Sequence, residues 1–139
     1  MTRRCVLLAD AHYNILEAVR SLLEGRFATT IMVADEPSLL EAAARMEPDL
    51  VVLDLSLPVS GRVNIVRTVL SQHPALRVIV LSVHDEQVAC SQAFAAGAAG
   101  FVLKRTAAAD LPKAVDAICR GETYVSPVLA WRPEGGGHE

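Results

Sequence analysis

Four polar side chains with complementary chemistry each follow a short apolar run of this sequence. They are two aspartates, a serine and a lysine: Asp10, Asp54, Ser82 and Lys104. Carboxylates suit a hard divalent cation such as Mg²⁺, whereas a hydroxyl and an ammonium group suit phosphoryl oxygens. A carboxylate between such groups can act as a nucleophile toward a phosphoryl group. If the four side chains meet, the pattern predicts phosphoryl transfer to Asp54 beside a bound cation.

The apolar runs themselves predict five β-strands. They are short, rich in Val, Ile and Leu and mostly without alternation, as expected for strands covered on both faces. Strands are expected at residues 6–9, 30–34, 50–53, 78–81 and 101–103. Helical patterns alternate with them, which predicts an α/β fold with a doubly wound five-stranded parallel sheet. In the order 2-1-3-4-5, the four polar side chains share one edge of the sheet, where ligands of open α/β sheets bind.

Start and stop signals place the helices between these strands. Ser38 and Glu41 have the spacing of a capping box, just after Pro37, and predict the start of the second helix. The third and fourth helices are expected at residues 63–70 and 84–96. The last helix is expected to begin at Asp110, with Pro112 tolerated in its first turn, and to end at residue 121.

Composition limits the class of protein. The 139 residues are 52% hydrophobic and 21% charged, which fits one folded domain and excludes general disorder. The net charge of −3 gives no sign of a nucleic-acid surface. The apolar stretch after the basic N-terminus stops at Asp10, too early for a signal peptide or a membrane span. Three scattered cysteines favour buried thiols in a reducing cytosol, so we expect a cytoplasmic protein without membrane contact.

The motifs at these strand ends resemble the receiver domain of bacterial response regulators, over roughly residues 3–121. Leu-Asp-Leu-Ser-Leu-Pro at 53–58 resembles the phosphoacceptor segment, and Val-Leu-Ser-Val-His at 80–84 resembles the segment of the switch hydroxyl. Gly-Ala-Ala-Gly-Phe-Val-Leu-Lys at 97–104 resembles the segment with the switch aromatic and the lysine. The resemblance implies a flavodoxin-like (CheY-like) three-layer sandwich. Residues 121–127 resemble the linker entry of NarL/FixJ (LuxR-type) transcription regulators.

The resemblance also implies roles for individual residues. Asp54 would accept a phosphoryl group from a histidine kinase, and Mg²⁺ would be held by Asp10, Asp54 and the backbone carbonyl of Ser56. Ser82 and Lys104 would bind the phosphoryl group. Phe101 would be the aromatic that, with Ser82, switches between two states. Such a domain is a signalling unit rather than an enzyme, with self-catalysed phosphotransfer to Asp54 and autodephosphorylation only.

The same resemblance implies the domain plan and the partners. Residues 1–121 would be the receiver domain, and residues 122–139 a flexible linker or tail, with the output domain absent from this chain. The partners would be a histidine kinase, a second copy in a homodimer and, only through an output domain, DNA.

The sequence departs from the family pattern in three places. Ala11 stands where members usually carry the second acid, which is normally the direct cation ligand. The usual glycine of the loop after Asp54 falls one place early, at Gly61, and Arg105 adds a cation after Lys104.

Two hypotheses about the Ala11 position follow. Either another ligand or water fills the gap and Asp54 is still phosphorylated, with weak Mg²⁺ binding. Or the chain is a pseudo-receiver, acting through dimerisation or protein contacts without phosphate.

Simpler interpretations exist for each residue taken alone. An aspartate or serine after a strand can cap a turn or helix, Phe101 can be a packed core residue, and Lys104 can be solvated. His12 and His84 are read as exposed loop histidines. A hydrolase of the aspartyl-phosphate class would need an acid at Ser56, and a flavodoxin would need a Ser/Thr/Gly-rich loop at residues 11–14.

Overall fold

The computed structural model describes residues 4–57, 64–83 and 87–129. The early glycine at Gly61, the interpretation of His84 and the tail from residue 130 onward lie outside these ranges. No helix within them is both long enough and apolar enough to cross a membrane.

Six strands form one sheet in the described chain, in the order β2-β1-β3-β4-β5-β6, with every neighbouring pair parallel. The doubly wound parallel fold and the order 2-1-3-4-5 are confirmed, but the predicted number of five strands is wrong. The strands are β1 (Cys5–Ala9), β2 (Thr29–Val33), β3 (Leu50–Asp54), β4 (Arg77–Ser82), β5 (Gly100–Leu103) and β6 (Tyr124–Val125).

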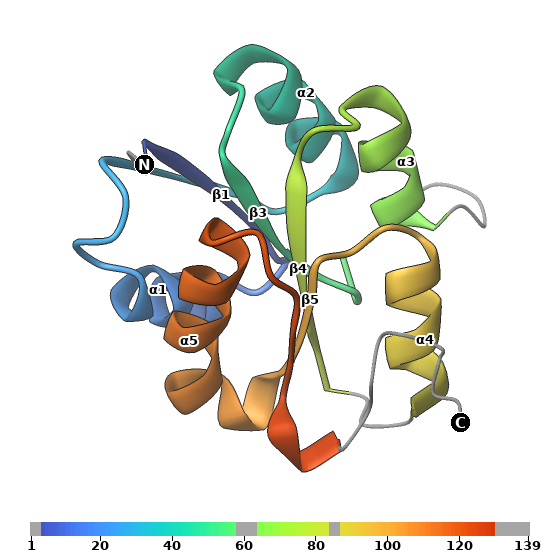
Figure 1. Cartoon of the computed structure of the whole chain (residues 1–139). Coiled ribbons are helices and arrows are strands. Elements are labelled where there is room, and N and C mark those ends of the chain that lie inside the picture. Colours follow the sequence, from blue (N-terminus) through green and yellow to red (C-terminus); the bar gives the residue numbers. More distant parts are fainter. Residues whose placement is uncertain (1–3, 58–63, 84–86, 130–139) are drawn as a thin grey trace.

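Helices cover both faces of the sheet, which makes three layers (Figure 1). Helices α1 (Tyr13–Leu22) and α5 (Ala107–Cys119) lie on one face. Helices α2 (Glu36–Met46), α3 (Ile65–Gln72) and α4 (Gln87–Ala95) lie on the other. Every residue of β1, β3 and β5 is therefore buried, although alternate side chains point to opposite faces. Double coverage explains why these strands are continuously apolar in the sequence.

Two predicted helix starts are wrong. Asp35, not Ser38, caps α2, because its Oδ1 accepts a hydrogen bond from the Ser38 backbone N–H at 2.9 Å. Helix α5 begins three residues before Asp110, so Pro112 lies inside the helix rather than in its first turn. Proline there removes one i→i−4 hydrogen bond. Burial of the apolar face of α5 against the sheet compensates for this loss.

The sixth strand arises from part of the segment predicted as linker. Tyr124 and Val125 pair with Gly100 and Phe101 of β5. Beyond them, the buried hydroxyl of Ser126 accepts a hydrogen bond from the Leu103 backbone N–H at 3.0 Å. A short 3₁₀ helix, η2, follows at Pro127–Leu129. Residues 124–129 therefore pack against the sheet, while the domain boundary at residue 121 stays a prediction.

Side chains on α5 strengthen this attachment. Asp110, which is 6% exposed, accepts hydrogen bonds from Thr106 Oγ1 and, at 3.0 Å, from the Tyr124 hydroxyl. Burial acts to raise the pKa of Asp110, but hydrogen bonds from Thr106, Ser126 and Tyr124 outweigh it and hold the pKa below its usual value. Burial and the bond to Asp110 raise the pKa of Tyr124 to about 12. The polar cluster ties β6 to the start of α5.

Candidate functional site

The four predicted side chains lie at the carboxyl ends of four neighbouring strands. Asp10 follows β1, Asp54 ends β3, Ser82 ends β4 and Lys104 follows β5. The register keeps them level, because Asp54 pairs with Leu81 and Ser82 pairs with Leu103, the residue before Lys104. Adjacent strands are about 4.8 Å apart, so the side chains share one edge of the sheet.

The ammonium group of Lys104 joins the two carboxylates. Lys104 Nζ lies 3.2 Å from Asp10 Oδ2 and 3.0 Å from Asp54 Oδ1. The Asp10 and Asp54 side chains are only 3% and 2% exposed, and the Lys104 side chain is 16% exposed. Two carboxylates and one ammonium leave the cluster with a negative formal charge. A buried site with that imbalance favours a further cation.

Asp54 also receives hydrogen bonds from the turn that follows β3. Its Oδ2 accepts a bond from Ser56 Oγ, and its Oδ1 lies 3.3 Å from the donating Ser56 backbone N–H. Burial acts to raise the pKa of Asp54, but the bonds from Ser56 and the ammonium of Lys104 outweigh it and lower the pKa. Asp54 is therefore ionised at neutral pH, as a nucleophile must be. The predicted role of the Ser56 carbonyl stays a prediction.

Asp10 has a second contact, with a residue that the sequence left outside the site. Its Oδ1 accepts a hydrogen bond from the His12 backbone N–H at 2.9 Å, and His12 Nδ1 lies 3.0 Å from the same oxygen. Asp10 Oδ2 is buried and, among the described residues, accepts no hydrogen bond; its contact with Lys104 is an ion pair without hydrogen-bond geometry. Ala11, between these two residues, is exposed and supplies no ligand.

Candidate ligand atoms of Asp10, His12 and Asp54 all lie within 4.8 Å of one another. His12 was predicted to be an ordinary exposed loop histidine. Its side chain is indeed 65% exposed, but the ring turns back over Asp10. The available signal was its position, two residues after a strand-ending aspartate. Arg105, the other added cation, is exposed at its place after Lys104.

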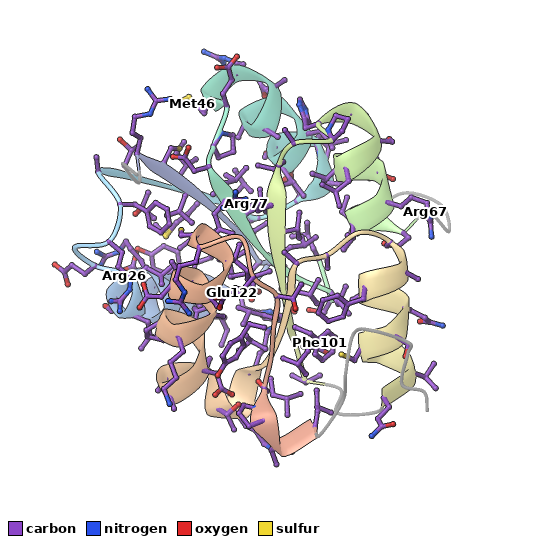
Figure 2. All side chains as sticks on the ribbon, in the orientation of Figure 1. Arg26, Met46, Arg67, Arg77, Phe101 and Glu122 are labelled. Carbon is purple, nitrogen blue, oxygen red and sulfur yellow. The ribbon has the colours of Figure 1, made fainter. Side chains whose placement is uncertain are left out.

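The two predicted switch residues are both buried. Ser82 is 1% exposed at the end of β4, and Phe101 is fully buried in β5. Phe101 belongs to the core cluster on the face of the sheet that α4 covers, together with Cys90 and Ala93 (Figure 2). This packing also fits the simpler interpretation of Phe101 as a core residue, so its switch role stays a prediction.

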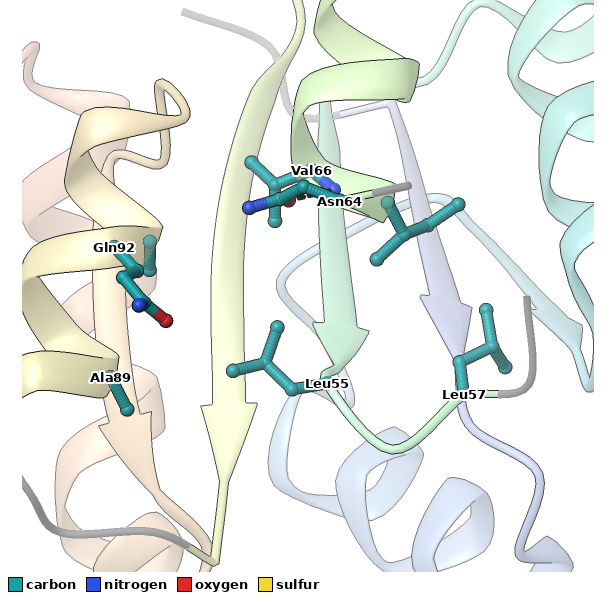
Figure 3. Close-up of a pocket in the computed structure, with 8 residues that line it drawn as sticks. Leu55, Leu57, Asn64, Val66, Ala89 and Gln92 are labelled. Atoms are coloured by element: carbon teal, nitrogen blue, oxygen red, sulfur yellow. Dashed lines mark hydrogen bonds between the residues drawn. The ribbon is translucent and has the colours of Figure 1, made fainter. Parts of the chain in front are cut away.

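A separate pocket of about 240 Å³ lies between α3 and α4 (Figure 3). Leu55 and Leu57, just after Asp54, line it, while Asn64 and Gln92 are its polar lining residues. The Asn64 side chain is already engaged, because it accepts hydrogen bonds from the first turn of α3. None of the four predicted site residues lines this pocket, so it is distinct from the carboxylate cluster.

Comparison with known families identifies the family to which this chain belongs. The family model of the response regulator receiver domain matches residues 6–116, a span that contains all four site residues. This chain belongs to that family. The receiver domain is similar to the DNA-binding transcriptional activator DevR/DosR of Mycobacterium tuberculosis. The two are 32% identical over 123 residues, which cover 86% of this chain and 56% of that protein.

A second relative is the transcriptional regulatory protein DegU of Brevibacillus brevis, 27% identical over 124 residues, 88% of this chain and 52% of that protein. The receiver domain thus spans about half the length of these two regulators. Among solved structures, a two-component response regulator of the LuxR family from Aurantimonas sp. SI85-9A1 has a TM-score of 0.85 at 31% identity, with 94% of each chain covered. The NarL/FixJ (LuxR-type) resemblance is consistent with these matches.

Proposed function

We propose that Asp54 is the phosphoacceptor of this receiver domain and takes its phosphoryl group from a histidine kinase. The observation that carries this proposal is the contact of one ammonium group, Lys104 Nζ, with both buried carboxylates at 3.2 and 3.0 Å. A structural aspartate at a strand end needs neither a second carboxylate nor a lysine ammonium that contacts both. The low pKa of Asp54 keeps an electron pair available on the carboxylate.

The residues around Asp54 fit the transfer. An Asp54 oxygen attacks phosphorus, and the bond from phosphorus to the kinase histidine nitrogen breaks. The electron pair of that bond stays on the nitrogen, and a proton from solvent keeps the leaving imidazole neutral. Lys104 and the Ser82 hydroxyl would bind the oxygens of the transferred group, since an ammonium and a hydroxyl form short bonds to phosphoryl oxygens. Lys104 would have to move from bridging two carboxylates to pairing with the phosphoryl group.

A divalent cation fits the same cluster. Asp10 Oδ2 is a buried carboxylate oxygen that accepts no hydrogen bond within the described chain, which is what a cation ligand requires. Asp10, Asp54 and the Ser56 carbonyl would hold Mg²⁺, whose contribution would be to neutralise charge on the phosphoryl oxygens. Ala11 removes one carboxylate from that set, so we expect weak Mg²⁺ binding.

The test compares native, Ala11→Asp and Asp54→Asn proteins. Mg²⁺ is titrated calorimetrically, and phosphate uptake from a small phosphodonor is followed by intact mass. We expect slow phosphorylation of the native chain, faster phosphorylation and tighter Mg²⁺ binding in Ala11→Asp, and none in Asp54→Asn. The added carboxylate should strengthen Mg²⁺ binding by a few kcal/mol at most, roughly, because solvent screens its charge.

Two outcomes would change the assignment. Phosphate uptake by neither the native chain nor Ala11→Asp would favour the pseudo-receiver, a protein-interaction module that works without phosphate. Equal Mg²⁺ affinity in both proteins would mean that another group compensates for Ala11.

The output is also part of the proposal. Transcriptional regulation is the function named for DegU and for DevR/DosR, of which this chain matches about half. We propose that phosphorylation of Asp54 controls such an output through a DNA-binding domain, while this domain alone does not bind DNA. Self-association as a homodimer stays a prediction, checked by sedimentation with and without the phosphodonor. A cytoplasmic location is likewise proposed.

A further inference from the structure

We infer that His12 supplies the third protein ligand of the cation pocket, through Nδ1, and that the pocket takes a divalent transition-metal ion in preference to Mg²⁺. The inference deepens the proposed function, because it concerns the cation site beside Asp54. It also gives the gap at Ala11 a specific replacement.

The three ligand atoms are already close enough to share an ion. Those of Asp10, His12 and Asp54 lie within 4.8 Å of one another. Ligand bonds of about 2.0–2.2 Å hold two ligand atoms up to about 4 Å apart. The group therefore has to close by less than about 1 Å, within the reach of small side-chain rotations.

The backbone directs the histidine ring into this position. His12 is extended (φ −107, ψ 111) at the N-cap of α1, and its N–H donates to Asp10 Oδ1 at 2.9 Å. This is an Asx-type turn, in which an aspartate bonds the backbone two residues on. It fixes the Asp10 carboxylate and returns the His12 ring to it, with Nδ1 3.0 Å from Oδ1. The ring is 65% exposed, so an ion can reach the buried carboxylates from solvent on that side.

A second observation, independent of the histidine, points to a cation ligand at Asp10. Asp10 Oδ2 is buried and accepts no hydrogen bond among the described residues. Its ion pair with Lys104 is shared with Asp54, so one positive charge serves two buried carboxylates. Buried carboxylate oxygens are normally hydrogen-bonded, paired or bound to a metal. An ion between the carboxylates and His12 would give Oδ2 its partner.

The chemistry of the ligand atoms decides which cation the pocket binds more tightly. Mg²⁺ prefers oxygen ligands in near-ideal octahedral geometry, and Ala11 takes one such oxygen away. Imidazole suits Zn²⁺, Co²⁺, Ni²⁺ and Fe²⁺ far better than it suits Mg²⁺. Exchanging a carboxylate for an imidazole therefore weakens Mg²⁺ binding and favours the transition metals.

The experiment measures Co²⁺ and Mg²⁺ binding calorimetrically on the untagged full chain, because a histidine tag would itself bind Co²⁺. His12→Ala should weaken Co²⁺ binding by roughly tenfold or more, and Mg²⁺ binding by less than about twofold. In the proton NMR spectrum, one histidine ring should show paramagnetic shifts with Co²⁺ that are absent in His12→Ala. The His12 side chain makes no capping bond to α1, so its removal leaves the helix start intact.

Two further variants make the result specific. His73→Ala is the matched control, because His73 directly follows α3, away from the carboxylates, and its loss should change neither affinity. Ala11→Asp should tighten Mg²⁺ binding and reduce the dependence of Co²⁺ binding on His12. Unchanged Co²⁺ affinity in His12→Ala, or equal losses for Co²⁺ and Mg²⁺, would overturn the inference.

Binding is measured without any phosphodonor, so the two proposals fail separately. Co²⁺ binding that depends on His12 in a protein that is never phosphorylated supports the metal site and rejects the phosphoacceptor. Phosphorylation of Asp54, together with Co²⁺ binding that does not depend on His12, supports the phosphoacceptor and rejects the metal site.

Discussion

Replacing Lys104 with methionine tests whether its ammonium group is what allows two carboxylates to be buried together. The ammonium lies 3.2 Å from Asp10 Oδ2 and 3.0 Å from Asp54 Oδ1. With an effective dielectric constant of about 20, each contact is worth about 5 kcal/mol before desolvation. Removing one partner from a buried pair costs about 3–5 kcal/mol, since the desolvation of the remaining charge is no longer offset. We therefore expect Lys104→Met to lower the free energy of unfolding by about that amount at pH 7.

The pH dependence and a second substitution separate charge from packing. In the native chain the pKa of Asp54 is lower in the folded than in the unfolded state. This difference contributes stability at every pH above the unfolded-state pKa, and the contribution is lost as pH falls through the folded-state pKa. In Lys104→Met, burial beside Asp10 should instead raise the Asp54 pKa. As pH falls, protonation of Asp54 should therefore remove one buried charge and reduce the loss of stability in the variant. The difference between native and variant should be largest at neutral pH. Adding Asp54→Asn should recover much of the loss, because one buried charge is removed.

The assay is urea unfolding followed by circular dichroism at pH 7 and pH 5. The matched control is Lys113→Met, which changes the chain's other lysine, an exposed residue of α5. Its effect should be within about 0.5 kcal/mol. Equal losses in Lys104→Met and in Lys104→Met/Asp54→Asn would refute the reasoning, because the loss would then come from the packing of the lysine stem.

Two further predictions concern stability away from the cluster. Asp110→Asn should cost about 1–3 kcal/mol at pH 7. The difference in unfolding free energy between the native chain and the variant, measured by urea titration, should narrow as pH falls below about 4. The reason is that the lowered pKa of Asp110 contributes stability that is lost on protonation. A difference that stays constant with pH would contradict this. Gly97→Ala should cost more than Gly121→Ala in thermal melts, since both have positive φ but a Cβ at Gly97 would approach Leu70 Cδ1 to 2.7 Å, whereas one at Gly121 meets nothing within 4 Å. Equal losses would show that Leu70 yields freely.

The sequence alone determined the main strands and the residues that end them. Strands buried on both faces have to be continuously apolar, so each ends visibly at the first charged or polar residue, as at Asp10 and Asp54. The alternation with helices then implied a parallel sheet, and the parallel sheet brought the strand ends together. These inferences depend on burial and chain direction, which leave a local trace in the sequence.

Helix starts were harder to predict from local signals. Both Asp35 and Ser38 are good N-cap residues, and the choice between them depends on where β2 ends and the chain turns. The start of α5 was misplaced because Pro112 resembles a first-turn residue. Burial of Ala107 and Leu111 against the sheet extends the helix toward its N-terminus, and no local pattern records that packing.

Only the tertiary structure decided the sixth strand and the contacts within the site. Tyr124–Val125 is too short and too close to glycine and proline to resemble a strand; pairing with β5 and the polar contacts of Ser126 and Asp110 make it one. The sequence likewise showed that Ala11 lacks a carboxylate, but not that the His12 ring turns back to Asp10. That direction depends on the turn at the end of β1, in which the His12 backbone N–H donates to Asp10 Oδ1. Contacts between residues distant in the chain, such as Lys104 with Asp10, are fixed by strand register, which local sequence does not encode.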